Sequence, residues 1–330
     1  MSDDMISMLT DQAGRLFGDL IDRDLLAGAE AGKAPAALAD AVEAFGLADA
    51  LTVPAEDGGL SFADAGTLFA LLGYHAVPLP IGETMLARML LARTGINAPD
   101  GDIALGDRSV GSTSAAAHVL LREAGQLLLL PAATQEVSSI SRAPRWAIDA
   151  NVEPVANAAW PADMPDALTL GAMLRASQIA GGVARALQMT IDYANERKQF
   201  GKPIGRFQAI QQQLAALAAE AAAARSAADA AWAALDGGSL GLMAAVAKIR
   251  AGQAARLACA IAHQVHGAIG VTDEHMLHYI TRRLWEWRTD FGTDAHWATL
   301  LGRAAREAEQ GLWHFITAGC PATQKIEEPA

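Results

Sequence analysis

The spacing of apolar residues divides the chain into two helical parts with a strand-rich stretch between them. From residue 1 to about 95, and again from 166 onward, apolar residues recur three and four positions apart, as on one face of a helix. Between 96 and 165, short apolar runs alternate with Gly, Pro, Ser and Asp, which is typical of strands and turns. The strands are predicted at Ala117–Leu121, Leu127–Leu130 and Trp146–Ile148.

We therefore expect a mostly α fold with a small β part. Its three domains are an N-terminal helical domain (1–95), a reduced middle β domain (96–165) and a C-terminal four-helix bundle (166–330). A loop rich in Gly and Pro precedes one N-terminal helix, and Ser61 or Asp64 is expected to cap that helix.

Long helical patterns joined by short segments predict that the C-terminal part is an up-and-down bundle. The first helix starts near residue 166, and Gly181-Gly182 within it allows a neighbouring helix to approach closely. The later helices are predicted at Phe207–Leu235, Leu240–His266, Glu274–Trp287 and Gly292–Phe315.

The join between the first two of these helices carries a basic cluster in an acidic chain. Pro203 has a fixed φ and no amide donor, so it should end the helix or lie in the turn that follows. A solvated helix hairpin accounts for this cluster, and composition alone favours that interpretation over an anion-binding site. The basic residues are Arg197, Lys198, Lys202 and Arg206.

Composition and charge exclude several classes of function. The formal net charge of −12 argues against nucleic acid as the main partner, because phosphate binding needs clustered positive charge. Cys259 and Cys320 form no Cys-x-x-Cys pair and no framework of disulfides. The first residues lack the basic start of a secretory signal, and no apolar run is long enough for a membrane span. We expect a soluble cytoplasmic protein.

Helical bundles can hold a di-iron centre, but the ligand pattern for one is missing. Such sites use Glu-x-x-His pairs on two helices. No glutamate in this chain has a histidine three residues later. The closest histidines lack carboxylates at ligand spacing, so no metal site is expected; they are His263, His266, His275 and His278.

Two ordered motifs change the interpretation of the basic join. Residues 197–208 read RKQFGKPIGRFQ, which resembles the R-x-Q-F-G-x-P-I-x-x-F-Q signature of the acyl-CoA dehydrogenase family. A second block, QVHGAIG at 264–270, resembles another motif of that family at the right distance downstream. The resemblance covers the C-terminal half well, the N-terminal third loosely and the middle poorly. It implies the family's fold: a helical domain, a β domain and a helical bundle.

The resemblance also implies a flavin cofactor, FAD. In the family the arginine reaches the FAD of a neighbouring protomer, and a guanidinium suits a pyrophosphate. At the second motif the family usually has Gly-Gly where this chain has Gly267-Ala268, and a Cβ is tolerated there only if φ is negative. The cofactor-binding residues implied are Arg197, Gln199, Phe200, Gln208, Ile210, Gln264, Val265, Gly267 and Ala268.

The catalytic base of the family is missing from both of its known positions. The family uses a carboxylate to remove the α-proton of an acyl-CoA thioester while a hydride leaves the β-carbon for the flavin. The commonest position is a Glu-Gly-Thr, which here reads Phe291-Gly292-Thr293. The second position, near Gly171, also lacks an acid, and Asp290 is only a weak alternative. The usual flavin-holding loop of the middle domain is not found either.

These observations resemble the non-catalytic subunit of a heterotetrameric acyl-CoA dehydrogenase of the kind that acts on steroid side chains and other bulky CoA thioesters. Such a chain completes the FAD site of a homologous catalytic subunit, which binds most of the acyl-CoA. An electron-transfer flavoprotein is the expected acceptor. One alternative is a complete homo-oligomeric enzyme with an unusual base, Asp290 or Glu286. The other is a cofactor-free helical scaffold.

Overall fold

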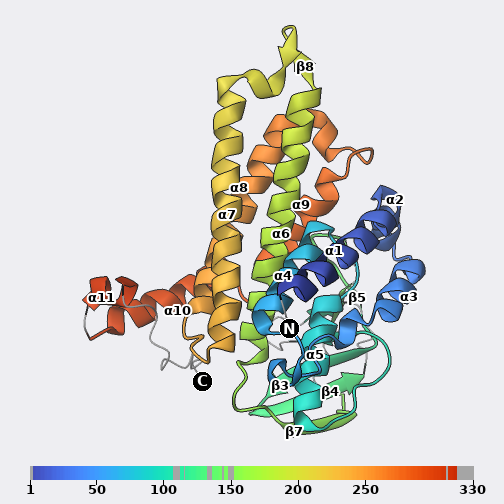
Figure 1. The fold of residues 1–330 in the computed structure, drawn as a ribbon, viewed down its shortest axis with the longest axis vertical. Coiled ribbons are helices and arrows are strands. Elements are labelled where there is room, and N and C mark those ends of the chain that lie inside the picture. Colours follow the sequence, from blue (N-terminus) through green and yellow to red (C-terminus); the bar gives the residue numbers. More distant parts are fainter. Residues whose placement is uncertain are drawn as a thin grey trace.

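The structure is a computed structural model that describes residues 3–106, 112–114, 116–131, 136–142, 145–147, 152–309 and 311–317. Figure 1 shows a tall bundle of helices standing above a lower body, in which the N-terminal helices pack beside the strands. One large apolar cluster runs through the N-terminal helices, the strands and the bundle. The described residues thus form a mostly helical molecule with a small β part, as predicted.

The described residues of the N-terminal part form five α-helices and two short 3₁₀ turns. The helix at Phe62–Tyr74 begins with a capping box, in which Ser61 accepts from the amide of Asp64 and Asp64 accepts from that of Ser61. Both residues proposed as caps therefore act at this one helix start. The five helices are α1 (Asp3–Leu20), α2 (Arg23–Glu30), α3 (Ala36–Phe45), α4 (Phe62–Tyr74) and α5 (Ile81–Thr94).

The strands form two small sheets, of strand order β1-β3-β4-β7 and β2-β6-β5. Val119, Leu121 and Leu130 form a small apolar cluster between the paired strands β3 and β4. The strands are β1 (Ile103–Leu105), β2 (Ser112–Ser114), β3 (His118–Glu123), β4 (Gln126–Pro131), β5 (Glu136–Val137), β6 (Arg145–Ala147) and β7 (Ala156–Ala159). The three predicted strands correspond to β3, β4 and β6, except that Ile148 lies outside the described residues.

The C-terminal bundle is built on one long helix, α6 (Ala167–Glu196), which packs against α7, α8 and α9. Asp166 caps its start by accepting from the amide of Thr169 at 2.7 Å. The other helices are α7 (Gln208–Asp236), α8 (Met243–His266), α9 (Leu277–Thr289), α10 (Asp294–Glu307) and α11 (Gly311–Thr317). Between α6 and α7 the chain forms a two-stranded hairpin, β8 (Lys198–Gln199) and β9 (Lys202–Pro203), and a 3₁₀ turn, η3 (Ile204–Arg206).

Glycines let α4 and α6 approach each other closely. A Cβ on Gly181 would lie 1.8 Å from the carbonyl oxygen of Ala70, and one on Gly73 would lie 1.9 Å from that of Gln178. The predicted role of Gly181 in close helix approach is confirmed, and its neighbouring helix is α4.

Two predicted helix starts lie three residues too early, and one predicted helix is interrupted. The third bundle helix begins at Met243 rather than Leu240. The fourth bundle helix begins at Leu277 rather than Glu274, because a 3₁₀ segment, η4 (Gly267–Val271), and a turn come first. The last predicted helix is interrupted after Glu307, where Ala308 is extended and Gly311 adopts a left-handed φ of 79°.

Candidate functional site

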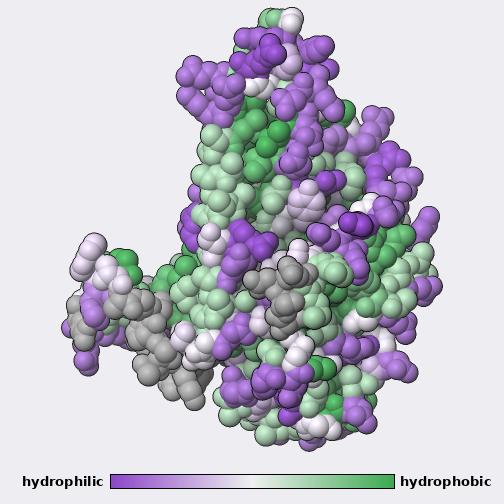
Figure 2. All heavy atoms as spheres, viewed as in Figure 1, coloured by the Kyte–Doolittle hydropathy of each residue, from purple (hydrophilic) through white to green (hydrophobic). Residues whose placement is uncertain are grey.

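The first family-like motif lies at the tip of the bundle, on the hairpin between α6 and α7 (Figure 1). Arg197 is the C-terminal cap of α6, and its side chain is exposed. Phe200 is 90% exposed and has a left-handed φ of 50°. The Lys202 ammonium lies 4.4 Å from the centre of the Phe207 ring. Figure 2 shows mostly hydrophilic side chains over this tip.

The second motif reaches the same end of the molecule. The ring of Tyr193, one turn before Arg197, stacks on His266 with centroids 4.5 Å apart. Gln264, Gly267 and Ala268 are exposed beside it. The structure therefore brings the two motifs together, although 67 positions separate Arg197 from Gln264 in the sequence.

Glycine is needed at the first position of the Gly-Ala pair. Gly267 has φ 64° and ψ −141°, a conformation that side-chain-bearing residues rarely adopt, and its Cβ direction faces open space. Ala268 is absent from the residues with positive φ, so its Cβ is tolerated as expected. The open backbone at this turn leaves room for a ligand to approach.

We call residues 197–208 and 264–271 the exposed end. Of the nine residues expected to bind a cofactor, Ile210 is half-buried and Val265 is buried, and the others are exposed; these are Arg197, Gln199, Phe200, Gln208, Gln264, Gly267 and Ala268. An outward-facing guanidinium beside an open glycine turn fits the pyrophosphate of FAD. Because these groups are exposed, a ligand can reach them from outside the chain.

The two expected positions for a catalytic base meet in the lower part of the bundle. Phe291 is buried, and its ring occupies the space beside Gly171: a Cβ on Gly171 would lie 2.2 Å from ring carbon Cδ1. The Arg175 guanidinium lies 5.5 Å from the same ring. An aromatic ring thus fills the volume where the resemblance places a carboxylate.

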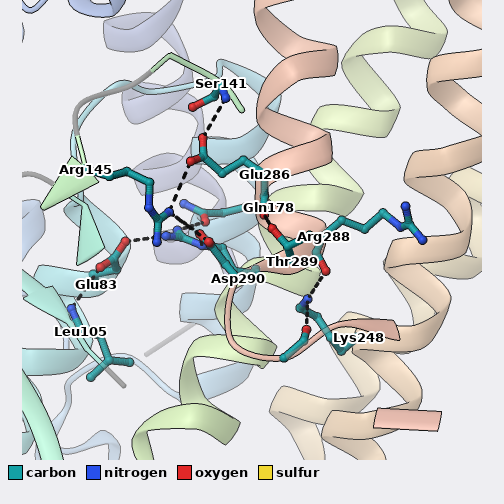
Figure 3. Close-up of polar contacts among 12 residues, drawn as sticks. Glu83, Leu105, Ser141, Arg145, Gln178, Lys248, Glu286, Arg288, Thr289 and Asp290 are labelled. Carbon is teal, nitrogen blue, oxygen red and sulfur yellow. Dashed lines mark hydrogen bonds and ion pairs between the residues drawn. The ribbon is translucent and has the colours of Figure 1, made fainter. Parts of the chain in front are cut away.

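Asp290, next to Phe291, is held by two arginines (Figure 3). Its carboxylate accepts from Arg145 at 2.9 and 3.1 Å and from Arg175 at 2.9 Å. Burial acts to raise the pKa of Asp290, but the two guanidiniums outweigh it and the pKa lies below its usual value. A carboxylate held ionised in this way is a weak proton acceptor.

The same arginines hold two further carboxylates. Arg175 also donates to Glu83 at 2.6 Å, and Glu83 accepts from the amide of Leu105 in β1 at 3.0 Å. Glu286 accepts from the amide of Ser141 at 3.2 Å and lies 3.5 Å from Arg145. We call Glu83, Arg145, Arg175, Glu286 and Asp290 the charge network; it joins α5, β6, α6 and α9.

The charge network forms one wall of a cavity of about 330 Å³ between α2, the α4–α5 connection, β6, α6 and α9. Apolar residues line much of the rest of it, among them Val77, Leu79, Trp146 and Trp287, and the remaining polar lining residues are Lys33, Ser141, Gln178 and Arg283. Within it, burial and the neighbouring Asp290 raise the pKa of Glu286. None of the nine residues expected to bind a cofactor lines this cavity.

A buried lysine fixes the connection that carries Phe291. Lys248 of α8 is fully buried and donates to the carbonyl oxygens of Arg288 at 2.9 Å and Gly292 at 2.8 Å. Trp297 donates to the carbonyl oxygen of Phe291 at 2.9 Å. Burial lowers the pKa of Lys248 to about 7. These three hydrogen bonds hold the backbone of the connection, where Phe291 has a left-handed φ of 51°.

Sequence reasoning missed Arg145, Arg175 and Lys248, although one signal for Arg175 was present. It lies in the run LGAMLRASQIAGG, where a single charged residue interrupts the buried face of a long helix. A buried charge of that kind must be paired, so a carboxylate partner could have been expected. Its two partners lie 92 and 115 positions away and could not have been chosen from the sequence.

Among the residues that the structure describes, no group of three or more His, Cys, Asp or Glu is arranged to hold a metal ion. Within the same ranges, no helix is both long and apolar enough to cross a membrane.

Comparison with known proteins gives the evolutionary relationship. A model of the acyl-CoA dehydrogenase C-terminal domain matches residues 160–305. Acyl-CoA dehydrogenase IpdE2 of Mycobacterium tuberculosis is 33% identical over 254 residues, which cover 72% of this chain and 76% of that protein.

Two solved structures share the fold. One, a variant of the Tcur3481-Tcur3483 steroid ACAD, has a TM-score of 0.77 at 24% identity and covers 91% of this chain and 97% of that one. The ChsE4-ChsE5 complex from Mycobacterium tuberculosis has a TM-score of 0.79 at 18% identity, covering 93% and 99%. Because IpdE2 of Mycobacterium tuberculosis is 33% identical over 72% of this chain, the chain belongs to the acyl-CoA dehydrogenase family.

Proposed function

We propose that this chain is a non-catalytic subunit of a hetero-oligomeric, flavin-dependent acyl-CoA dehydrogenase. It completes the FAD site of a homologous catalytic subunit with Arg197 and Gln264, and it provides no base of its own. The observation that carries the proposal is the packing of Phe291 on Gly171, because the two positions for a base contain a phenyl ring and a glycine in contact.

The exposed end supports a role toward another protomer. FAD, when bound, accepts the hydride from the β-carbon of the acyl thioester; the role of this chain is to bind and orient it. Arg197 supplies a charge-assisted donor for a phosphate oxygen. The open backbone at Gly267 allows the pyrophosphate to approach, and Gln264 presents an amide beside it.

Exposed apolar side chains support a protein partner. Phe200 is 90% exposed and Val271 is 66% exposed, both at the exposed end. Helix α11 projects away from the rest of the molecule (Figure 1) and exposes Leu312, Trp313 and Ile316 by 59%, 79% and 64%. Large apolar side chains gathered in this way mark contact surfaces. The names of two structural neighbours, ChsE4-ChsE5 and Tcur3481-Tcur3483, each join the designations of two proteins. This supports a pairing of unlike chains.

The acyl group is of the fatty acid or steroid side-chain type, and the partner subunit binds most of it. An electron-transfer flavoprotein takes the electrons from the reduced flavin, and the complex works in the cytoplasm. The names of the neighbours support the steroid class, since one is called a steroid ACAD.

A second candidate is a complete homo-oligomeric enzyme with an unusual base. Among the carboxylates near Phe291, Glu286 suits that role better than Asp290, because its pKa is raised and it lines the cavity. The third hypothesis is a cofactor-free helical scaffold. Flavin content distinguishes it from the non-catalytic subunit and from the homo-oligomeric enzyme.

Flavin content and native mass of the purified chain test the proposal, measured alone and after co-expression with a homologue that contains Glu-Gly-Thr at the base position. We expect a colourless chain alone and a complex with about one FAD per pair of unlike chains. A yellow tetramer of this chain alone, with one FAD per protomer, contradicts the proposal and favours the homo-oligomer. A complex without flavin favours the scaffold.

A further inference from the structure

One wall of the cavity contains a buried cation that the charge network does not use. Arg283 of α9 is only 6% exposed and lines the cavity, and its Nε has no hydrogen-bond partner. It makes no hydrogen bond or ion pair with any residue that the structure describes. Glu30 and Glu286 act on Arg283 only from beyond ion-pair distance. A buried guanidinium without a directly bonded anion is costly, so its presence in a cavity wall points to a ligand.

The neighbouring acids are already paired with other bases. Asp290 and Glu83 accept from Arg175, and Glu286 lies beside Arg145. Outside the cavity, Glu30 pairs with the adjacent Arg282. Burial lowers the pKa of Arg283 only to about 10, so the guanidinium is charged at neutral pH.

Arg283 is the buried cation of the described lining that no acid contacts at ion-pair distance. The three lining acids, Glu83, Glu286 and Asp290, lie against Arg145 and Arg175, and Lys33 is exposed. A carboxylate in the cavity would give Arg283 an ion-pair partner. The volume of about 330 Å³ and the apolar part of the wall, including Trp146 and Trp287, suit a compact apolar body.

We propose that this cavity binds a small carboxylate with a compact apolar body, whose carboxylate pairs with Arg283. The inference concerns this chain alone and does not depend on flavin binding or on a catalytic partner. Carboxylate and guanidinium meet in a fork geometry that an ammonium does not reproduce, so the pair selects an acid over its neutral analogues.

The test uses adamantane-1-carboxylate and its neutral analogue, adamantane-1-carboxamide, titrated into the full-length chain by calorimetry. Quenching of tryptophan fluorescence gives a second readout, because Trp146 and Trp287 line the cavity. We expect one acid per chain and an amide that binds at least about tenfold more weakly, as for loss of one charge-assisted pair. Equal affinities for acid and amide overturn the proposal, as does no binding of the acid at about 10 mM.

Substitutions at Arg283 test whether this residue pairs with the ligand carboxylate. Arg283→Met should reduce acid affinity at least about tenfold and leave amide affinity unchanged, and Arg283→Lys should restore part of the loss. The matched control is Arg256→Met, which removes an exposed positive charge on α8 and should change neither affinity. Unchanged acid affinity in Arg283→Met overturns the proposal. If that variant does not fold, the acid and amide comparison on the unaltered chain decides.

Discussion

The two ends of helix α6 use charged residues in opposite ways. Near its start, Arg175 is buried and donates to Glu83, Gln178 and Asp290. At its C-terminal cap, Arg197 is exposed. The two arginines are 22 positions apart, which is about 33 Å along a helix. A charge satisfied within the chain stabilises the fold, whereas one left exposed is available to another molecule.

Substitutions in the charge network should therefore change the stability of the fold. Asp290→Asn leaves two buried guanidiniums without their shared anion, and we expect it to lower the free energy of unfolding by about 3–5 kcal/mol. Chemical denaturation measures the change. The control is Asp229→Asn, which breaks a half-exposed ion pair with Arg225 on α7 and should cost under about 1 kcal/mol. Similar losses in both variants would contradict a structural role for the network.

A smaller loss is expected where Phe291 packs on α6. Gly171→Ala places a Cβ 2.2 Å from the Phe291 ring, and overpacking of this kind costs about 1–3 kcal/mol. In a double-mutant cycle with Phe291→Ala, the two losses should be less than additive, because removing the ring makes room for the methyl group. Gly302→Ala on α10, which meets nothing within 4 Å, is the control and should not destabilise. Strict additivity in the cycle would show that ring and glycine are not coupled.

The pH dependence of stability should report on Lys248. Burial lowers its pKa from 10.5 to about 7, so between these values the unfolded chain carries a proton that the folded chain lacks. The contribution of Lys248 to the free energy of unfolding therefore rises as pH increases from about 7 towards 10.5, and it is least favourable below 7. Denaturation at several pH values should give a shallower rise in Lys248→Met than in the unaltered chain. Identical slopes would contradict the lowered pKa.

The exposed end should show the smallest effect on stability and a large effect on the cofactor. Arg197→Ala should change the free energy of unfolding by less than about 0.5 kcal/mol, because its side chain is exposed. In the complex with the catalytic subunit, the same change should weaken FAD binding at least about tenfold through loss of a charge-assisted contact. Flavin released on dilution measures this. Arg303→Ala, an exposed change on α10, is the control. Equal flavin retention in both variants would remove Arg197 from the cofactor site.

How much was predictable from the sequence also differs between the two ends. The fold class and the two motifs of the exposed end could be recognised, because those residues are contiguous and their order is specific. The missing base could be inferred from Phe291 and Gly171 for the same reason. The charge network could not, since its members come from α5, β6, α6 and α9 and are joined only by tertiary packing. The pair Arg282-Arg283 on a predicted helix is typical of salt bridges along that helix, and the burial of Arg283 depends on tertiary packing.

In our account, the exposed end contributes to the FAD site of a partner subunit, whereas the region of the charge network and Phe291 performs no catalysis. The most direct test is acyl-CoA oxidation by the two-subunit complex in which the partner's base glutamate is changed to glutamine. If this chain is non-catalytic, activity falls to the level of the blank while the flavin stays bound. If a substantial fraction of the activity remains, a base in this chain acts on the acyl-CoA, and the account is wrong.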